Sequence, residues 1–249
     1  MTESLVHLDV ADGVATITLD SQRNRNALSK QLVTELSAHL ATAEVDDSAR
    51  AVVIAAAGPV FCAGADMAEA AQGGMEEGAR VLVALQRQIV ASAKPVVVRL
   101  QGPVRAGGLG IVGAADVVVA ADTVTFAFTE VRLALAPAVI SLTTLPRLTD
   151  RAAALTYLGG ATFDAAEAAR IGLITQAVAA DGLDAAIDAV LADLRKGSPQ
   201  GLRETKALLN ADLLPRIDAL GEQVAAQSAR LFSSDKAREA MIAFLNRKR

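Results

Sequence analysis

Short apolar runs typical of buried strands alternate with helical segments through much of this sequence. AVVIAAAG (51–58) and KPVVVRLQG (94–102) are continuous apolar runs of the length expected for strands buried on both faces. Between them, residues 78–92 place apolar side chains at helical spacing. The same spacing follows Ser29, a residue type that caps helix N-termini, and continues to about residue 45. This alternation predicts an α/β fold.

The first twenty residues predict a β-hairpin. VHLDVADGVATITLD (6–20) alternates apolar and polar residues on both sides of Asp12-Gly13, a dipeptide that favours tight hairpin turns. Further along, DVVVAADTVTFAFTE (116–130) indicates two short strands around Asp122-Thr123. The overall pattern is therefore a ββα unit that repeats.

Helices dominate the last third of the chain. From about Arg151 only GLITQAV (172–178) has an extended pattern, and KGSPQG (196–201) interrupts the periodicity with glycine, serine and proline. Beyond that break only helical spacing remains. A helical tail of this kind packs either on its own core or on a partner subunit.

Composition limits the kinds of protein this chain can be. At 249 residues with 52% hydrophobic content it can bury a real core. A net charge of -4 gives no general attraction to nucleic acid or to anionic membranes, so neither is an expected partner. The single Cys62 excludes an internal disulfide and fits a reducing compartment. With no pattern of a signal peptide or a membrane span, a cytoplasmic location is expected.

Several kinds of chemistry lack their usual residues. The two histidines, His7 and His39, fall in a predicted strand and an amphipathic helix, where a structural role is the more ordinary one. No HExxH, CxxC, GxSxG or GxxxxGK[ST] string occurs, so no metal site and no phosphate-binding loop of these types is expected. Backbone amides and carboxylates remain as the candidate catalytic groups.

The stretch VRAGGLGIVGAAD (104–116) contains four glycines where its apolar spacing indicates a helix. Glycine costs a helix about 1 kcal/mol relative to alanine at each position. Either another element packs close against this backbone, or the backbone touches a group that a side chain would block.

A second loop of small residues, PVFCAGADM (59–67), follows the strand at 51–58. Both loops follow strands, and the glycine-rich loop at 102–110 opens a helix, whose N-terminal amides carry partial positive charge. If each loop aimed one amide at the same oxygen, the pair would form an oxyanion hole suited to a thioester enolate.

The strings FCAGADM, QGPVRAGGLG with AAD, and TEVRLALAP together resemble the crotonase superfamily, the enoyl-CoA hydratase/isomerase family. The resemblance runs from residue 23 to residue 249. Residues 130–148 resemble mycobacterial-type hydratase paralogues in particular. The resemblance implies a crotonase-like ββα spiral core over 1–195 and a C-terminal helical trimerisation region over 196–249. It also implies an acyl-CoA substrate, no separate cofactor, and a homotrimer or a hexamer built as a dimer of trimers.

The resemblance also implies roles for individual residues. The oxyanion hole falls on the amides of Ala65 and Gly107, and the acid/base on Glu130. The residues expected to bind the substrate and its CoA part are Arg25, Ala63, Gly64, Asp66, Met67, Gly108, Phe244 and Arg247.

One position departs from the family pattern. Hydratases of this family typically hold a water molecule between two glutamates, and the first of these falls here on Gly110. Hydration of a 2-enoyl-CoA by Glu130 remains the leading expectation. The alternatives are a Δ3,Δ2-enoyl-CoA isomerase that uses Glu130 as its sole proton carrier, and a CoA-ester-binding protein with weak catalysis.

Other polar residues near these motifs carry lesser expectations. Asp66 is expected to cap the following helix, and Asp116 to end its helix or make a local hydrogen bond. Glu76 and Glu77 are either replacement acids or a solvated helix start. Arg105 is expected to face solvent or a structural partner, with a carboxylated substrate or Glu130 as the alternatives.

Overall fold

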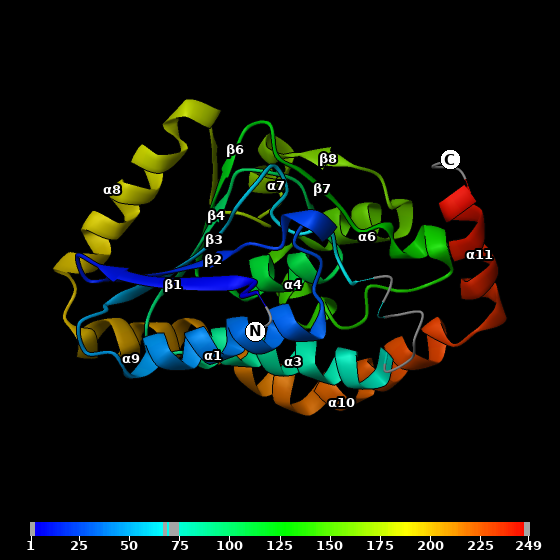
Figure 1. Ribbon diagram of the computed structural model, residues 1–249, viewed down its shortest axis with the longest axis horizontal. Helices are drawn as coiled ribbons and strands as arrows, with labels where there is room; N and C mark the ends of the chain where they lie inside the picture. The colour runs from blue at the N-terminus through cyan, green and yellow to red at the C-terminus, as the bar shows by residue number, and fades with distance from the viewer. Residues whose placement is uncertain (1–2, 67–68, 70–74, 247–249) are drawn as a thin grey trace.

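The computed structural model describes residues 3–66, 69 and 75–246. Within these residues, six strands form one sheet in the order β1-β2-β3-β4-β6-β9 (Figure 1). Every neighbouring pair is parallel except β1 and β2. These strands are β1 (Val6–Ala11), β2 (Val14–Leu19), β3 (Ala51–Ala56), β4 (Val96–Leu100), β6 (Val117–Ala121) and β9 (Gln176–Val178).

A small second sheet has the order β5-β7-β8, in which β5 and β7 are parallel and β8 is antiparallel. Its strands are β5 (Val104–Arg105), β7 (Thr125–Ala127) and β8 (Phe163–Asp164). The chain thus leaves the large sheet after β4 and after β6 to build the small one. Repeated strand pairs with helical crossovers confirm the predicted α/β fold.

Helices connect and cover the strands. The α-helices are α1 (Lys30–Val45), α3 (Met75–Ala91), α4 (Gly107–Ala114), α5 (Ser141–Thr144), α6 (Asp150–Gly159), α7 (Ala165–Arg170), α8 (Leu183–Lys196), α9 (Pro199–Leu209), α10 (Leu213–Phe232) and α11 (Asp235–Asn246). The 3-10 helices are η1 (Gln22–Asn24), η2 (Thr129–Leu133), η3 (Leu145–Arg147) and η4 (Ala180–Gly182). No described helix combines the length and the apolar character needed to cross a membrane.

Local sequence signals account for several boundaries. Asp12 and Gly13 have φ of 50° and 79°, the left-handed pair that a tight hairpin turn needs, and β1 pairs with β2 around them. Ser29 caps α1, because its side chain accepts a hydrogen bond from the Leu32 amide. Both features confirm the sequence predictions.

Helix α10 packs along α3 of the same chain (Figure 1). Two ion pairs join their exposed edges, Arg80 with Glu222 at 2.7 Å and Arg87 with Asp218 at 2.6 Å. Helix α10 of the helical tail therefore packs on the core of its own chain, which is the first of the two arrangements considered.

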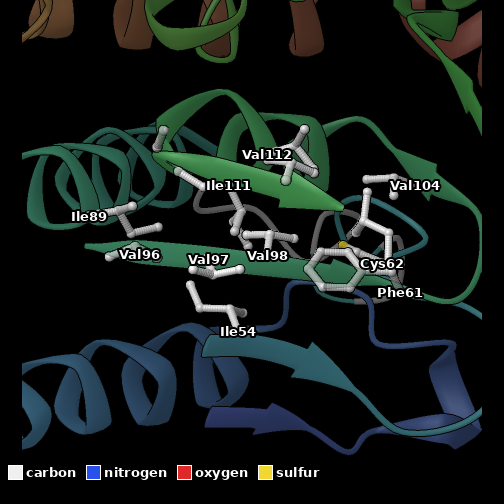
Figure 2. Packing of buried hydrophobic residues seen from close by; sticks show 14 of the residues in the cluster. Ile54, Phe61, Cys62, Ile89, Val96, Val97, Val98, Val104, Ile111 and Val112 are labelled. Atoms are coloured by element: carbon white, nitrogen blue, oxygen red, sulfur yellow. The ribbon is translucent and has the colours of Figure 1, made fainter. Parts of the chain in front are cut away.

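The core lies on both faces of the large sheet. Consecutive residues of β3 and β4, whose side chains point to opposite faces, are buried. Figure 2 shows Val97 and Val98 of β4 between Ile54 of β3 and Ile111 of α4, and none of these four residues is exposed. The continuous apolar runs predicted as buried strands are these central strands, since a strand covered on both faces has no solvent-facing side.

A buried ion pair anchors α9 to the sheet. Lys206 and Asp116 are 4% and 11% exposed, and their charged atoms lie 2.8 Å apart. Asp116 also accepts a hydrogen bond from the Val96 amide at 2.7 Å, and the Lys206 ammonium donates to the carbonyls of Ile89 and Lys94 at 2.9 Å. The expectation that Asp116 ends its helix or makes a local hydrogen bond is therefore wrong, since its partners are Val96, 20 residues away in the chain, and the still more distant Lys206.

Candidate active site

A cavity of about 580 Å³ lies among α3, α4, α10 and the segment 136–140. Ala65, Gly107 and Glu130 all line it. Most of its remaining wall is apolar, with Leu82 on α3 and Phe232 at the end of α10 as examples. The three residues expected to carry the chemistry are therefore brought together from three separate segments.

The two glycine-containing loops lie directly against each other. The Cys62 amide donates to the Pro103 carbonyl at 3.3 Å, and the Arg105 amide donates to the Cys62 carbonyl at 3.0 Å. Gly64 has φ of +105°, and a Cβ built on it would lie 3.0 Å from the Ala106 side chain. Only glycine adopts that backbone easily and allows that approach.

The amides of Ala65 and Gly107 are available to a ligand. Leu28 donates its amide to the Gly64 carbonyl at 2.8 Å, so the alternation of an extended chain turns the Ala65 amide the other way. Gly107 is the first residue of α4, where the amides have no acceptor within the helix. Among the hydrogen bonds of the described residues, neither amide has a protein acceptor. Two such donors on one cavity can bind an oxyanion.

Close packing explains the glycines of α4. A Cβ on Gly108 would lie 2.7 Å from the Cys62 Cβ, and one on Gly110 would lie 3.0 Å from the Gln86 side chain. A Cβ on Gly107 would lie 2.6 Å from the Leu28 side chain, which lines the cavity. A Cβ on Gly113 would lie 2.8 Å from the backbone of Thr143. Of the two explanations for the glycine-rich stretch, neighbouring elements that pack close against the backbone account for all four positions.

Cys62 lies at the junction of the two loops. Its sulfur accepts the Gly64 amide at 3.5 Å and is also hydrogen-bonded by the Gly108 amide. Figure 2 shows the sulfur among Phe61 and Val104. Burial raises the pKa of this thiol to about 12, so it stays protonated and behaves as a core side chain.

Glu130 lies in η2, which follows β7 of the small sheet, and one of its carboxyl oxygens is buried. That atom, Oε2, has no hydrogen-bond partner among the described residues. Burial raises the pKa of Glu130 from 4.5 to about 7. Tyr157 lies nearby, and its pKa is raised above the usual range by burial and, less, by the Glu130 charge. A carboxyl that has one unpartnered oxygen and a pKa near neutrality, on a cavity, is suited to proton transfer.

Only some of the residues expected to bind the substrate line the cavity. Asp66 lines the cavity, accepts a hydrogen bond from the Asn24 side chain at 2.9 Å, and accepts the Glu69 amide at 3.2 Å, as a helix cap does. Arg25 is exposed, and its carbonyl accepts the Ala63 amide at 3.1 Å.

Arg25, Ala63, Gly64 and Gly108 are not among the residues that line the cavity. Phe244 belongs to α11, whereas Met67 and Arg247 lie outside the described residues.

The structure also separates the alternatives for the other charged residues. Arg105 donates to the carbonyl and the hydroxyl of Thr125, so it has the structural partner expected of it. Glu76 pairs with Arg80 at 2.6 Å on the exposed side of α3, whereas Glu77 lines the cavity. Glu77 is thus the one of the two acids placed to meet a ligand.

Four parts of the cavity wall were not predicted from the sequence. They are the start of α1 with Lys30 and Val33, Leu82 on α3, the segment 136–140, and Ser228 with Phe232 on α10. The sequence does contain a signal for α10. Val224, Ser228 and Phe232 are four residues apart, so they lie on the same face of the helix. No local pattern distinguishes the segment 136–140 as a binding wall.

Comparisons with known proteins agree with this architecture. The model of the enoyl-CoA hydratase/isomerase family matches residues 9–249. The crystal structure of an enoyl-CoA hydratase from Mycobacterium avium is 49% identical, with a TM-score of 0.93 and coverage of 99% of this chain and 98% of that chain.

Two curated relatives differ in the reaction that their names give. A "Probable enoyl-CoA hydratase" of Rhodobacter capsulatus is 30% identical over 256 residues, which cover 100% of this chain and 97% of the relative. "Enoyl-CoA delta isomerase 2" of Rattus norvegicus is 27% identical over 243 residues, which cover 95% of this chain and 62% of the relative.

Proposed function

The chain belongs to the enoyl-CoA hydratase/isomerase family, and from that premise we propose that it adds water to a 2-enoyl-CoA thioester. The amides of Ala65 and Gly107 hold the enolate oxygen, and Glu130 moves the proton. One observation carries the proposal: these three residues line one cavity, and within it Glu130 has a buried, unpartnered carboxyl oxygen.

The geometry supports a simple sequence of steps. The thioester carbonyl accepts hydrogen bonds from the two amides, with the positive end of the α4 dipole behind Gly107. Ionised Glu130 takes a proton from water as the water oxygen bonds to the β-carbon, and the carbon–carbon π electrons move toward the thioester oxygen. The enolate then collapses as Glu130 returns its proton to the α-carbon. The two amides stabilise the charge that develops, typically by several kcal/mol.

A second candidate, Δ3,Δ2-enoyl-CoA isomerisation, is favoured by the surroundings of Gly110. The space beside Gly110 is filled by Gln86 and Ile140, at 3.0 and 3.1 Å from a built Cβ. Position 110 therefore supplies no acid to hold a water molecule. Isomerisation needs only one carboxylate, which takes the α-proton of a 3-enoyl thioester and returns a proton to the γ-carbon.

The two reactions change the absorbance of the conjugated enoyl thioester in opposite directions. Wild-type protein that hydrates crotonyl-CoA removes this absorbance, whereas isomerisation of trans-3-hexenoyl-CoA creates it. We expect loss of signal with crotonyl-CoA. Gain of signal with 3-hexenoyl-CoA alone identifies an isomerase. Binding of both esters without turnover identifies a CoA-ester-binding protein with weak catalysis.

We expect the reaction to depend on pH through Glu130. Burial raises the pKa of this carboxyl to about 7, and only the ionised form can accept a proton. The value of kcat/KM should therefore rise with pH and level off above about 7. Steady-state rates from acidic to mildly alkaline buffers measure this profile, and a rate already at its plateau near the ordinary glutamate pKa would contradict the assignment.

We also propose that coenzyme A enters only as part of the substrate, and that the protein works in the cytoplasm as a homotrimer or a dimer of trimers. Residues 196–249, assigned as the oligomerisation region, follow the core over 1–195. Exposed leucines support an assembly, with Leu155 and Leu158 on α6 and Leu208 and Leu209 on α9 each more than 70% exposed. Light scattering should give the mass of three or six chains, and a monomer mass would exclude the assembly.

A further inference from the structure

Gln86 of α3 is a fully buried polar side chain that the proposed reaction does not use. Its amide nitrogen donates to the carbonyls of Leu82 at 3.2 Å and Val139 at 3.3 Å. Its amide oxygen accepts the hydroxyl of Thr143 at 2.7 Å. The side chain thus uses both of its N–H donors and its carbonyl acceptor inside the protein.

Two of these partners belong to different walls of the cavity. Leu82 lines it from α3, and Val139 lines it from the segment 136–140. Thr143 lies at the same time 3.1 Å from the carbonyl of Gly110 on α4, the helix that begins with Gly107. Gln86 itself is not among the lining residues. From behind the wall, Gln86 therefore joins α3 directly to the segment 136–140 and, through Thr143 of α5, to α4.

Gly110 makes room for this side chain. A Cβ at position 110 would lie 3.0 Å from the Gln86 side-chain carbon Cδ and from its oxygen. Ile140, which lines the cavity, would lie 3.1 Å from the same Cβ. Any side chain at position 110 would press on the amide and on the wall in front of it. The glycine and the glutamine therefore form one packing unit.

We propose that Gln86 is a positioning residue that sets the spacing between α3 and the segment 136–140, and through it which acyl chains the cavity accepts. The inference rests on the proposed function, because it assigns the cavity to the acyl group. An amide is the group required here, since its donors face two carbonyls and its acceptor faces a hydroxyl. A carboxylate would face the same carbonyls with lone pairs, and a thioether would make none of these hydrogen bonds.

The test replaces Gln86 by methionine, which has a similar volume and no amide. Without the hydrogen bond to Val139, the segment 136–140 is free to move outward. The kcat/KM for esters with longer acyl chains should therefore rise relative to that for short ones. We expect the ratio of kcat/KM for a twelve-carbon to a four-carbon 2-enoyl-CoA to rise about tenfold, the discrimination that a small change in an apolar pocket produces.

Gln88 provides a matched control on the same helix. It is hydrogen-bonded to Ser37 of α1, which donates to it at 2.6 Å and accepts from it at 2.9 Å, and it does not line the cavity. Gln88→Met therefore removes a comparable pair of hydrogen bonds elsewhere. It should lower the thermal midpoint and leave the chain-length ratio unchanged.

A second variant and a binding measurement keep the test decisive. Gln86→Glu preserves the shape of the side chain and should shift the ratio in the same direction. Calorimetric titration with saturated four- and twelve-carbon acyl-CoA gives a ratio of Kd values that needs no turnover.

An unchanged ratio in both Gln86 variants, with only the thermal midpoint lowered, would overturn the role of Gln86. Absence of wild-type turnover on every ester would instead overturn the proposed function, and the Kd ratio would still report on Gln86.

Discussion

The Glu130→Gln variant should turn over its acyl-CoA substrate about 10²- to 10⁴-fold more slowly than the wild type, the usual contribution of a positioned acid/base. Glutamine keeps the shape of the side chain and loses the ability to accept and return a proton. The loss should fall on kcat, with the Kd for a saturated acyl-CoA almost unchanged, because the amides of Ala65 and Gly107 remain in place. Steady-state kinetics and calorimetric titration measure the two quantities.

Glu76→Gln is the control for that experiment, since Glu76 pairs with Arg80 on the exposed side of α3 and does not line the cavity. It should retain wild-type rates. If Glu130→Gln also retains them, a different residue carries the proton and the proposed mechanism is wrong.

The same variant should alter the pH dependence of stability. The folded-state pKa of Glu130 is raised from 4.5 to about 7, so the unfolded chain releases this proton at a lower pH than the folded protein. Ionisation therefore costs the wild type stability as the pH rises through that window. Because glutamine does not ionise, Glu130→Gln should gain free energy of unfolding relative to the wild type above about pH 7, and not at pH 4. A carboxyl kept at the cost of stability is common at catalytic sites.

Lys206→Met should lower the free energy of unfolding by about 3–5 kcal/mol, the loss found when one partner of a buried ion pair is removed. The variant leaves the Asp116 carboxylate, 11% exposed, without its cation. It also removes the two hydrogen bonds that the ammonium donates to the carbonyls of Ile89 and Lys94. Denaturant unfolding followed by circular dichroism gives the change.

Two comparisons separate the buried charge from other causes. Lys196 pairs with Asp193 on the surface, with side chains 77% and 80% exposed, so Lys196→Met should change stability by no more than about 0.5 kcal/mol. The double variant Lys206→Met with Asp116→Asn should recover much of the loss, because no buried charge remains unpaired. A double variant as unstable as Lys206→Met would show that lost packing, and not the stranded charge, is responsible.

Much of the fold could be predicted because its signals are local. The Asp12-Gly13 turn, the Ser29 cap and the buried strands over 51–56 and 96–100 each depend on a few neighbouring residues. The resemblance to mycobacterial-type hydratases is also confirmed by the Mycobacterium avium relative. By contrast, β8 (Phe163–Asp164) was not predicted, because two residues are too few to show a periodicity.

The two loops of the candidate site could be predicted from the sequence, but the side chains that form the rest of the cavity wall could not. The small residues around Gly64 and Gly107 mark places where backbones meet, and the structure brings them together. The partners of Gln86 lie 53 and 57 residues away in the chain at Val139 and Thr143, so no sequence window contains that network. No local pattern predicts the Lys206–Asp116 ion pair either, since it joins α9 to the residue that precedes β6.

The contribution of α10 to the cavity affects when the site can exist during synthesis. Ala65, Gly107 and Glu130 are synthesised first, whereas Ser228 and Phe232 close the same cavity from α10, about 100 residues after Glu130. A nascent chain that ends before α10 contains every strand of the large sheet and both glycine-containing loops, but lacks this wall of the cavity. The cavity can therefore be completed only once α10 has been synthesised, after the strands of the large sheet are available to pair.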